Sequence, residues 1–398
     1  MENEAKVRIR RQISTKELER RWEAVRQVMK EKKLDFLITQ CSTDFLGGYI
    51  RWFTDIPTTN NYTATLIFPQ KDDMTTIFHG PNPPAEPAPV KWNARGIKKR
   101  ISVPALPSLE YSTTWEAEKA VDELKKYKNA CIGFVGMGFI TAAFYNHLTK
   151  NLPNSVKFEE VTDFVDEIKC VKSPEEIDCI KEAAAIQEAT FEYVISRIRP
   201  GNREYHVYMD IREKVTELGG EQGIVTVGSA PAGTPCTFHH LHYCNRMIED
   251  GDTVHFMIET NGPSGLYSET MRTACVGKAP SELLEQYELV LEAQKVTLDM
   301  LKPGADPEEI YEANNAFMRK HGYPEEKRIY CHGQGYDLVE RPSMNPGEKL
   351  KIKAGMNITI HPTIASAKAS AQVCDNFIVQ EKGPALRLHT APHKIWIV

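Results

Sequence analysis

The segment "AGMNITIHPTIASAKASAQVCDNFIV", residues 354–379, contains two short runs of strand-forming residues. Each run carries one reactive side chain among β-branched or aromatic neighbours: His361 in the first run and Cys374 in the second. Side chains along a strand alternate between its two faces, so His361 shares a face with Thr359, and Cys374 shares one with Asn376. We expect these two polar faces to open into one cavity.

Composition and charge restrict the classes of protein to which the chain can belong. Its 398 residues are 41% hydrophobic and 26% charged, which is typical of a globular protein with more than one domain. The net charge of −5, without a basic block, predicts no nucleic-acid partner. No apolar run reaches the roughly 20 residues that span a bilayer, so no membrane partner is expected. Nine cysteines without CxxC pairs and a polar N-terminus predict a cytoplasmic protein with reduced thiols.

Helix-capping signals indicate two domains. Ser14 begins a capping box before an alternation of helical and strand-like segments, which predicts an α/β domain over residues 1–168. A second capping box at Ser173, followed by Pro174, begins a long helical pattern. Long helices and mostly antiparallel strands then predict an α+β domain over residues 171–398.

Four strand-like stretches of the second domain contain reactive residues. A single His in a strand is most often a hydrogen-bonded core residue, and a single buried Cys most often packs in a core. The joint occurrence of these residues favours a functional site over four separate core positions. The candidates are His239, His240, His242, Glu259, Glu269, His332, His361 and Cys374.

Six motifs in a fixed order resemble one known family. They are "IKCVKSPEEIDCIKEAA" (168–184), "EDGDTV" (249–254), "YSETMRT" (267–273), "CHGQG" (331–335), "AGMNITIHP" (354–362) and "VCDNFIVQEKGPALRLH" (373–389). The family is that of creatinase, prolidase and aminopeptidase P, the pita-bread or peptidase M24-like proteins. The resemblance covers nearly the whole chain. It implies an α/β N-terminal domain, an α+β pita-bread catalytic domain like that of creatinase, and a homodimer.

The metal-binding positions depart from the pattern of that family. Its metallopeptidases hold two divalent ions with two Asp, one His and two Glu. A His and a Cys in place of the two Glu cannot both bridge two hard cations, so a dinuclear centre is not expected. A second His that helps those enzymes to bind peptides is absent as well. The matching positions here are Met257 and Glu269 for Asp, His332 for His, His361 and Cys374 for Glu, and Val339 for the second His.

Two kinds of site remain compatible with the resemblance. The first holds no metal and resembles that of creatinase and ectoine hydrolase, in which a His acts as acid and base. Eleven residues before Gly251, that position is His240, with His239 and His242 as neighbouring catalytic or substrate-binding candidates. Glu259 or Glu269 would then orient the imidazole or activate water.

The second kind of site holds a single Fe, Mn or Zn ion. Two imidazoles and one carboxylate, from His332, His361 and Glu269, form a ligand set of the facial-triad type. Cys374 would be a soft ligand or a nucleophile with a His as its base. Arg272 is a candidate for binding a substrate carboxylate, with a structural salt bridge as the alternative.

The expected reaction is hydrolysis of a C–N bond in a small polar metabolite, with no cofactor or with a single divalent metal. The alternatives are a single-metal lyase or hydrolase resembling dimethylsulfoniopropionate lyase, and a binding protein without turnover. Cleavage of Xaa-Pro dipeptides is not expected.

Overall fold

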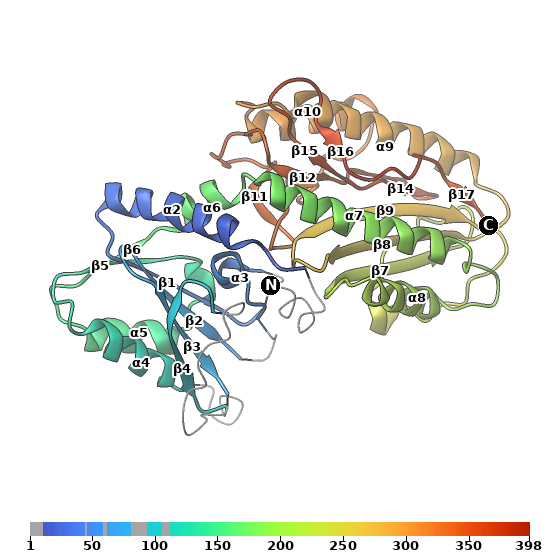
Figure 1. The fold of residues 1–398 in the computed structure, drawn as a ribbon. Coiled ribbons are helices and arrows are strands. Elements are labelled where there is room, and N and C mark those ends of the chain that lie inside the picture. The colour runs from blue at the N-terminus through green and yellow to red at the C-terminus, as the bar shows by residue number, and fades with distance from the viewer. Residues whose placement is uncertain (1–10, 44–45, 59–61, 81–93, 106–111) are drawn as a thin grey trace. The chain divides into compact units, whose positions relative to one another are not determined.

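The computed structural model describes residues 11–43, 46–58, 62–80, 94–105 and 112–398. The chain divides into two compact units, Met1–Lys169 and Cys170–Val398, and the Ser173 capping box lies near the start of the second (Figure 1). The Ser173 hydroxyl accepts a hydrogen bond from the Glu176 N–H, and the Glu176 carboxylate accepts one from the Ser173 N–H. This box satisfies two of the free N–H groups at the start of the following helix.

The N-terminal unit is a six-stranded mixed sheet in the order β4-β3-β2-β1-β5-β6. Its strands are β1 (Phe36–Cys41), β2 (Ala64–Pro69), β3 (Met74–His79), β4 (Ile97–Val103), β5 (Cys131–Phe134) and β6 (Lys157–Glu160). Its helices are α2 (Thr15–Lys32), α3 (Tyr49–Thr54), α4 (Trp115–Leu124), the short η2 (Met137–Phe139), α5 (Ala142–Asn151) and α6 (Thr162–Lys169). Ile67 packs with α4 and α5, whereas its neighbour Phe68 contacts Phe53 of α3, so helices cover both faces of the sheet.

The C-terminal unit combines a four-stranded sheet, β17-β9-β8-β7, with a five-stranded sheet, β11-β10-β12-β15-β16, and a two-stranded ribbon, β13-β14. The strands are β7 (Gly223–Ala230), β8 (Thr253–Asn261), β9 (Tyr267–Cys275), β10 (Cys331–Gly333), β11 (Glu340–Ser343), β12 (Asn357–Ile360), β13 (Thr363–Ala365), β14 (Ser370–Gln372), β15 (Asp375–Ile378), β16 (Leu386–Arg387) and β17 (Trp396–Ile397). The helices are α7 (Pro174–Ile195), α8 (Glu204–Glu217), the short η3 (Leu241–Tyr243), α9 (Ser281–Met300) and α10 (Pro307–Lys320).

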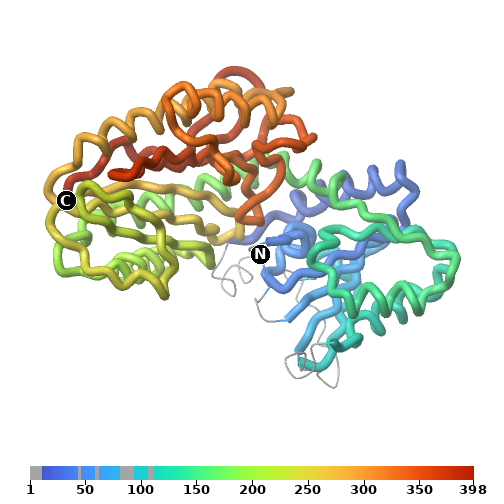
Figure 2. The backbone as a smooth tube through the Cα atoms, turned by 180° about the vertical axis from the view of Figure 1, so that it is seen from behind, coloured from blue at the N-terminus to red at the C-terminus, as the bar shows by residue number. Residues whose placement is uncertain are grey.

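Helices cover the outer faces of both large sheets in this unit. Phe191 of α7 and Ile211 of α8 pack against Phe256 and other apolar side chains of β7 and β8. On the other side, Ile310 of α10 joins a core that contains Ile358 and other residues of β12 and β15. Figures 1 and 2 show α9 and α10 on one side of the unit and α7 and α8 on the other, with the strands between them. The polar strand faces therefore meet inside the unit.

A backbone bridge joins the two large sheets. A bridge between Met271 of β9 and Cys374, the residue before β15, brings the two sheets into contact. The Met271 N–H donates to the Cys374 carbonyl at 3.3 Å. This junction places side chains of β9 beside those of β10, β12 and β15, where the reactive residues lie.

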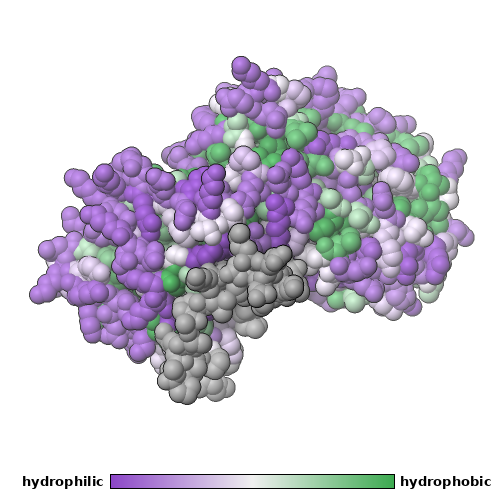
Figure 3. Space-filling view, viewed as in Figure 1, coloured by the Kyte–Doolittle hydropathy of each residue, from purple (hydrophilic) through white to green (hydrophobic). Residues whose placement is uncertain are grey.

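The face drawn in Figure 3 is largely hydrophilic, with separate hydrophobic patches. Among the described helices, none is long and apolar enough to cross a membrane.

Candidate metal centre

Three buried side chains from three strand regions converge inside the C-terminal unit. Glu269 lies on β9, His332 lies on β10, and His361 directly follows β12. Each offers one ligand atom, and these three atoms all lie within 4.8 Å of one another. The His332 and His361 rings are 5.2 Å apart between centroids and are inclined by 72°. The structure thus brings together the single-metal set that strand alternation and the motif order predict.

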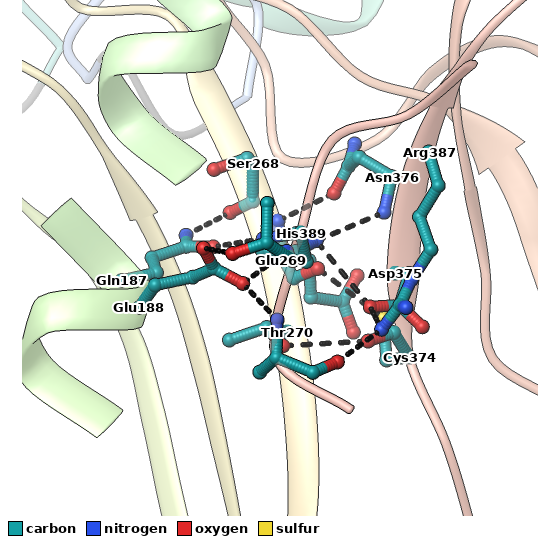
Figure 4. A network of polar contacts seen from close by, with 12 residues as sticks. Gln187, Glu188, Ser268, Glu269, Thr270, Cys374, Asp375, Asn376, Arg387 and His389 are labelled. Carbon is teal, nitrogen blue, oxygen red and sulfur yellow. Dashed lines mark hydrogen bonds and ion pairs between the residues drawn. The ribbon is translucent and has the colours of Figure 1, made fainter. Parts of the chain in front are cut away.

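Strand register explains this convergence. β12 is the central neighbour in its sheet, with His332 opposite Thr359 on one side and Asn376 opposite Thr359 on the other. His361 follows Thr359 by two residues, so its side chain lies on the same face. The Glu269 N–H donates to Asn376 Oδ1 at 2.7 Å, which ties β9 to this row of side chains. Figure 4 shows Glu269, Cys374 and Asn376 within one network of polar contacts.

Both imidazoles are held in the neutral form. Burial lowers the pKa of His332 to about 4, and burial together with the nearby His332 and Arg328 lowers the pKa of His361 well below its usual value. His332 Nδ1 lies 2.9 Å from the carbonyl oxygen of Gly333, so Nδ1 carries the proton and the lone pair is on Nε2. His361 Nδ1 is buried with no hydrogen-bond partner. Neutral rings with a free nitrogen are the form in which histidine binds a metal.

A second carboxylate faces Glu269. Glu259 of β8 lies directly opposite Glu269 in the antiparallel register, and both side chains are buried. Burial and the neighbouring Glu269 raise the pKa of Glu259 well above its ordinary value. Burial also raises the pKa of Glu269 to about 7, against the hydrogen bonds from Cys374 and Thr359 that favour its ionised form. Two buried carboxylates cannot both ionise cheaply without a cation, so this pair favours a bound positive charge.

The donor set fits one divalent ion. Two neutral imidazoles and a carboxylate are the ligands of many Zn and non-haem Fe sites. The His361 Nδ1 atom is buried without a hydrogen-bond partner, which a bound ion would supply. His332, His361 and Glu269 would hold the ion. Glu259 and Thr359 lie around this set, and Met257 pairs with Met271 further along the strands.

Cys374 contacts this site as a hydrogen-bonding neighbour. Its Sγ lies 3.2 Å from Thr359 Oγ1, and the Thr359 hydroxyl also lies 3.3 Å from Glu269 Oε2. Burial and Glu269 raise the pKa of the thiol well above its usual value. A neutral thiol is a poor nucleophile, so the geometry favours a role in fixing Glu269 over nucleophilic catalysis.

Arg272 forms the structural salt bridge that was the alternative to substrate binding. Its guanidinium is buried and donates to Asp375 Oδ1 at 2.7 Å and to the carbonyl oxygens of Met271 and Cys374. Asp375 points away from Cys374 and also binds Arg387 and His393. Figure 4 shows Asp375 with Arg387 beside this network. With its charge paired inside the protein, Arg272 has no free face for a substrate carboxylate.

The three neighbouring histidines lie elsewhere in the unit. His240 and His242, before and within η3, are exposed, and His239 Nδ1 lies 3.7 Å from the buried carboxylate of Glu204. In the part of the chain that the structure describes, no hydrogen bond or ion pair joins them to Glu269, His332 or His361. Their predicted catalytic or substrate-binding roles stay predictions.

Sequence reasoning placed Asn376 on the polar face of its strand but missed Gln334, which lies behind the site. Gln334 Nε2 donates to Glu259 Oε1 at 2.8 Å, and Gln334 Oε1 accepts from Asn376 Nδ2 at 2.9 Å. Gln334 follows His332 by two residues in "CHGQG", so an amide among glycines beside a candidate ligand was the available signal. Its partners lie on distant strands and could not be predicted from the sequence.

The chain is similar in sequence to known peptidases. The family model described as metallopeptidase family M24 matches residues 178–381, just over half of the chain, and this segment contains all the residues of the candidate site. The "Probable dipeptidase PepE" of Mycobacterium bovis is 30% identical over 241 residues, 60% of this chain and 63% of that protein. The chain therefore spans less than two thirds of that relative. The Xaa-Pro dipeptidase of Pyrococcus horikoshii is 27% identical over 291 residues, 71% of this chain and 82% of that protein.

Solved structures share the architecture. The dipeptidase PepE of Mycobacterium ulcerans has a TM-score of 0.76 with 23% identity, and the match covers 98% of this chain and 100% of that one. The Xaa-Pro dipeptidase of Bacillus anthracis has a TM-score of 0.74 with 20% identity, covering 96% and 100%. The predicted pita-bread fold, with an α/β N-terminal domain, is confirmed.

Proposed function

We propose that this chain, which belongs to metallopeptidase family M24, hydrolyses a C–N bond in a small polar molecule and binds a single divalent metal ion for this purpose. The observation that carries the proposal is the set of three buried donor atoms within 4.8 Å of one another, beside a second buried carboxylate. In the described part of the chain, His239, His240 and His242, the acid–base candidates of a metal-free site, make no hydrogen bond or ion pair with this set.

The residues of the site have distinct tasks in such a reaction. A divalent ion held by Glu269, His332 and His361 would supply Lewis acidity for an attacking water and for the carbonyl or imine group under attack. Thr359 orients Glu269 by a hydrogen bond to Oε2. Glu259, whose pKa burial and Glu269 raise above its ordinary value, takes up the proton that water releases and delivers it to the leaving nitrogen.

The proposal differs from the two-metal mechanism of the family in one structural respect. Two adjacent dications need bridging carboxylates to balance their charge. His361 and Cys374 stand at the positions where the sequence motifs of the family place these carboxylates, and Cys374 contacts Glu269 and Thr359. The carboxylates of Glu269 and Glu259 can balance the positive charge of a single divalent ion.

Metal analysis and a substrate screen test the proposal together. Protein purified without added ions should contain about one divalent ion per chain, and chelation should remove both the ion and the activity. Amides, cyclic amidines, imides and betaines are the substrates to screen, with release of ammonia or amine as the readout. His332→Ala should lose the ion, whereas the control His321→Ala, at the C-terminal end of α10, should retain it.

Three outcomes would contradict the proposal. Two ions per chain would restore the family's dinuclear mechanism, and full activity after chelation would favour the metal-free site. Product formation without uptake of solvent oxygen would indicate a lyase.

Xaa-Pro dipeptides should not be useful substrates. The site lacks the two bridging carboxylates, and Val339 stands at the position of the peptide-binding His in the family motif. We expect no release of proline above the background, even with added Mn or Co, in an assay that includes a known prolidase as the positive control. Robust metal-stimulated release of proline would show that this expectation is wrong.

A further inference from the structure

A chain of buried side-chain amides runs behind the proposed metal ligands. The Glu269 N–H donates to Asn376 Oδ1, and Asn376 Nδ2 donates to Gln334 Oε1. Gln334 Nε2 then donates to Glu259 Oε1. Asn357 supports the middle of this series of hydrogen bonds. Its Oδ1 accepts from Asn376 Nδ2 at 3.0 Å, and its Nδ2 donates to the backbone carbonyl of Gln334 at 3.1 Å. The three amide residues are almost completely buried.

The direction of these hydrogen bonds is set by the backbone. The oxygen and nitrogen of a side-chain amide are normally told apart only through their hydrogen bonds. A backbone N–H can only donate, so the atom of Asn376 that faces Glu269 must be the oxygen. The Asn376 amino group then faces Gln334, whose oxygen must accept. The Gln334 amino group is left with Glu259 as its acceptor.

We propose that Gln334 is a positioning residue for Glu259, with its orientation imposed by Asn376. This inference rests on the proposed function, in which Glu259 transfers the proton. Gln334 holds Oε1 of Glu259, and no hydrogen bond among the described residues reaches Oε2. Oε2 is therefore the oxygen left for a hydrogen bond to water or a substrate. The Gln334 amide therefore determines which oxygen of the Glu259 carboxylate transfers the proton.

Asn376→Asp gives the sharpest test of this direction. A carboxylate at this position still accepts from the Glu269 N–H, but it has no hydrogen to donate to Gln334. Gln334 would turn its amino group toward the new carboxylate and its oxygen toward Glu259. When Glu259 is ionised to act as the base, two acceptors would then face each other, and Glu259 would lose its fixed orientation.

Kinetics on three variants separate positioning from stability. Gln334→Met keeps the volume but removes the amide, and Gln40→Met is the matched control. Gln40 is fully buried in the N-terminal unit and likewise donates one hydrogen bond, to Thr65, and accepts one, from the Thr141 N–H. We expect Gln334→Met and Asn376→Asp to lower kcat about 10- to 100-fold with little change in KM or metal content. Gln40→Met should lower the thermal stability and leave kcat unchanged.

The double variant and one spectroscopic measurement complete the test. Since both substitutions act through one hydrogen-bond chain, Gln334→Met with Asn376→Asp should cost about as much as either alone. In protein labelled with ¹⁵N-glutamine, the side-chain resonances of Gln334, assigned by their loss in Gln334→Met, should shift in Asn376→Asp and stay unmoved in Gln40→Met. This readout does not depend on turnover.

The outcomes distinguish the two proposals. If the wild-type protein hydrolyses nothing in the screen while the Gln334 resonances shift in Asn376→Asp, the amide chain stands and the proposed function fails. If hydrolysis is found and Gln334→Met has the same kcat as Gln40→Met, the positioning role is wrong. Unmoved Gln334 resonances in Asn376→Asp would overturn the direction of the chain.

Discussion

His361 is buried at the end of β12 and is followed directly by a proline. The His361 N–H donates to the Tyr330 carbonyl at 2.8 Å, and the following Pro362 has no N–H with which to extend the pairing toward β15. β12 ends at Ile360, directly before His361. The His361 imidazole therefore lies at the end of the strand, beside His332 of the neighbouring strand. The ring lies beside His332 with an unpartnered Nδ1, a cost that a bound ion could offset.

Replacing His361 by Ala should abolish metal binding and activity and leave the fold intact. The substitution removes one of three proposed ligands, but it breaks no hydrogen bond of Nδ1, which has no partner. The free energy of unfolding should change by less than about 3 kcal/mol, within the range of ordinary substitutions. Metal content, turnover and urea unfolding measured on the same preparation check this. Turnover within threefold of the wild-type value would leave His361 as a core residue.

At the scale of elements, the polar side chains on the two faces of β15 and its preceding residue have different partners. Cys374 and Asn376 face the proposed metal site, while Asp375 between them faces Arg272, Arg387 and His393. The buried ion pair of Arg272 and Asp375 ties β9 to β15 beside the point where the two sheets join. His389 lies next to this cluster, where Nδ1 accepts from the Asn376 N–H and Nε2 contacts Gln187 Oε1.

His389 should make the stability of the protein depend on pH. Burial lowers the pKa of His389 to about 3, although Asp375 acts in the opposite direction. The unfolded chain, with a His pKa of about 6.5, binds the proton first as the pH falls. This contribution to stability is therefore fully present above pH 6.5 or so, and it is lost between about pH 6.5 and 3 at roughly 1.4 kcal/mol per pH unit.

Urea unfolding of the wild type and of His389→Asn at several pH values tests this. Asn cannot be protonated, so the variant should be less stable than the wild type at pH 7. The difference should shrink by about 3 kcal/mol between pH 6.5 and 4. His321→Asn serves as the control for a partly exposed histidine. A difference between wild type and His389→Asn that stays constant with pH would contradict the expected effect.

At the scale of the whole molecule, the residues proposed to bind metal all belong to the unit Cys170–Val398. This unit has its own helix-covered cores and begins with contacts of its own. Val171 pairs with Met356, and the buried Lys172 ammonium binds Glu340. The homodimer and the cytoplasmic location expected from the sequence stay predictions.

A fragment of residues 170–398 should therefore fold and bind the divalent ion with the stoichiometry of the full chain. Its unfolding should be cooperative, because its hydrophobic clusters are complete within these residues. Mass spectrometry of metal content and circular dichroism during heating are the measurements. A fragment that begins at residue 178, without the Ser173 capping box and Lys172, should be less stable. An unfolded or metal-free 170–398 fragment would show that the unit is not autonomous.

The sequence alone determined the fold class and the two strand faces that carry the site. Helix caps, strand alternation and the order of six motifs depend on neighbours along the chain, so they can be recognised without coordinates. This is why Glu269, His332 and His361 could be grouped before their distances were known. The resemblance placed Met257 at the family's first Asp position and kept Glu259 as a catalytic candidate, and Glu259 is the carboxylate that lies opposite Glu269.

Only the tertiary structure decided which side chains meet across strands. Arg272 is paired with Asp375, Gln334 holds Glu259, and Cys374 lies against Thr359. These contacts depend on strand register and on the junction between two sheets, which bring together residues separated by as many as 103 positions. A one-residue shift in register would reverse which side chains face the site. The local pattern gives the face of each residue, but the partner on that face depends on the folded arrangement of the whole unit.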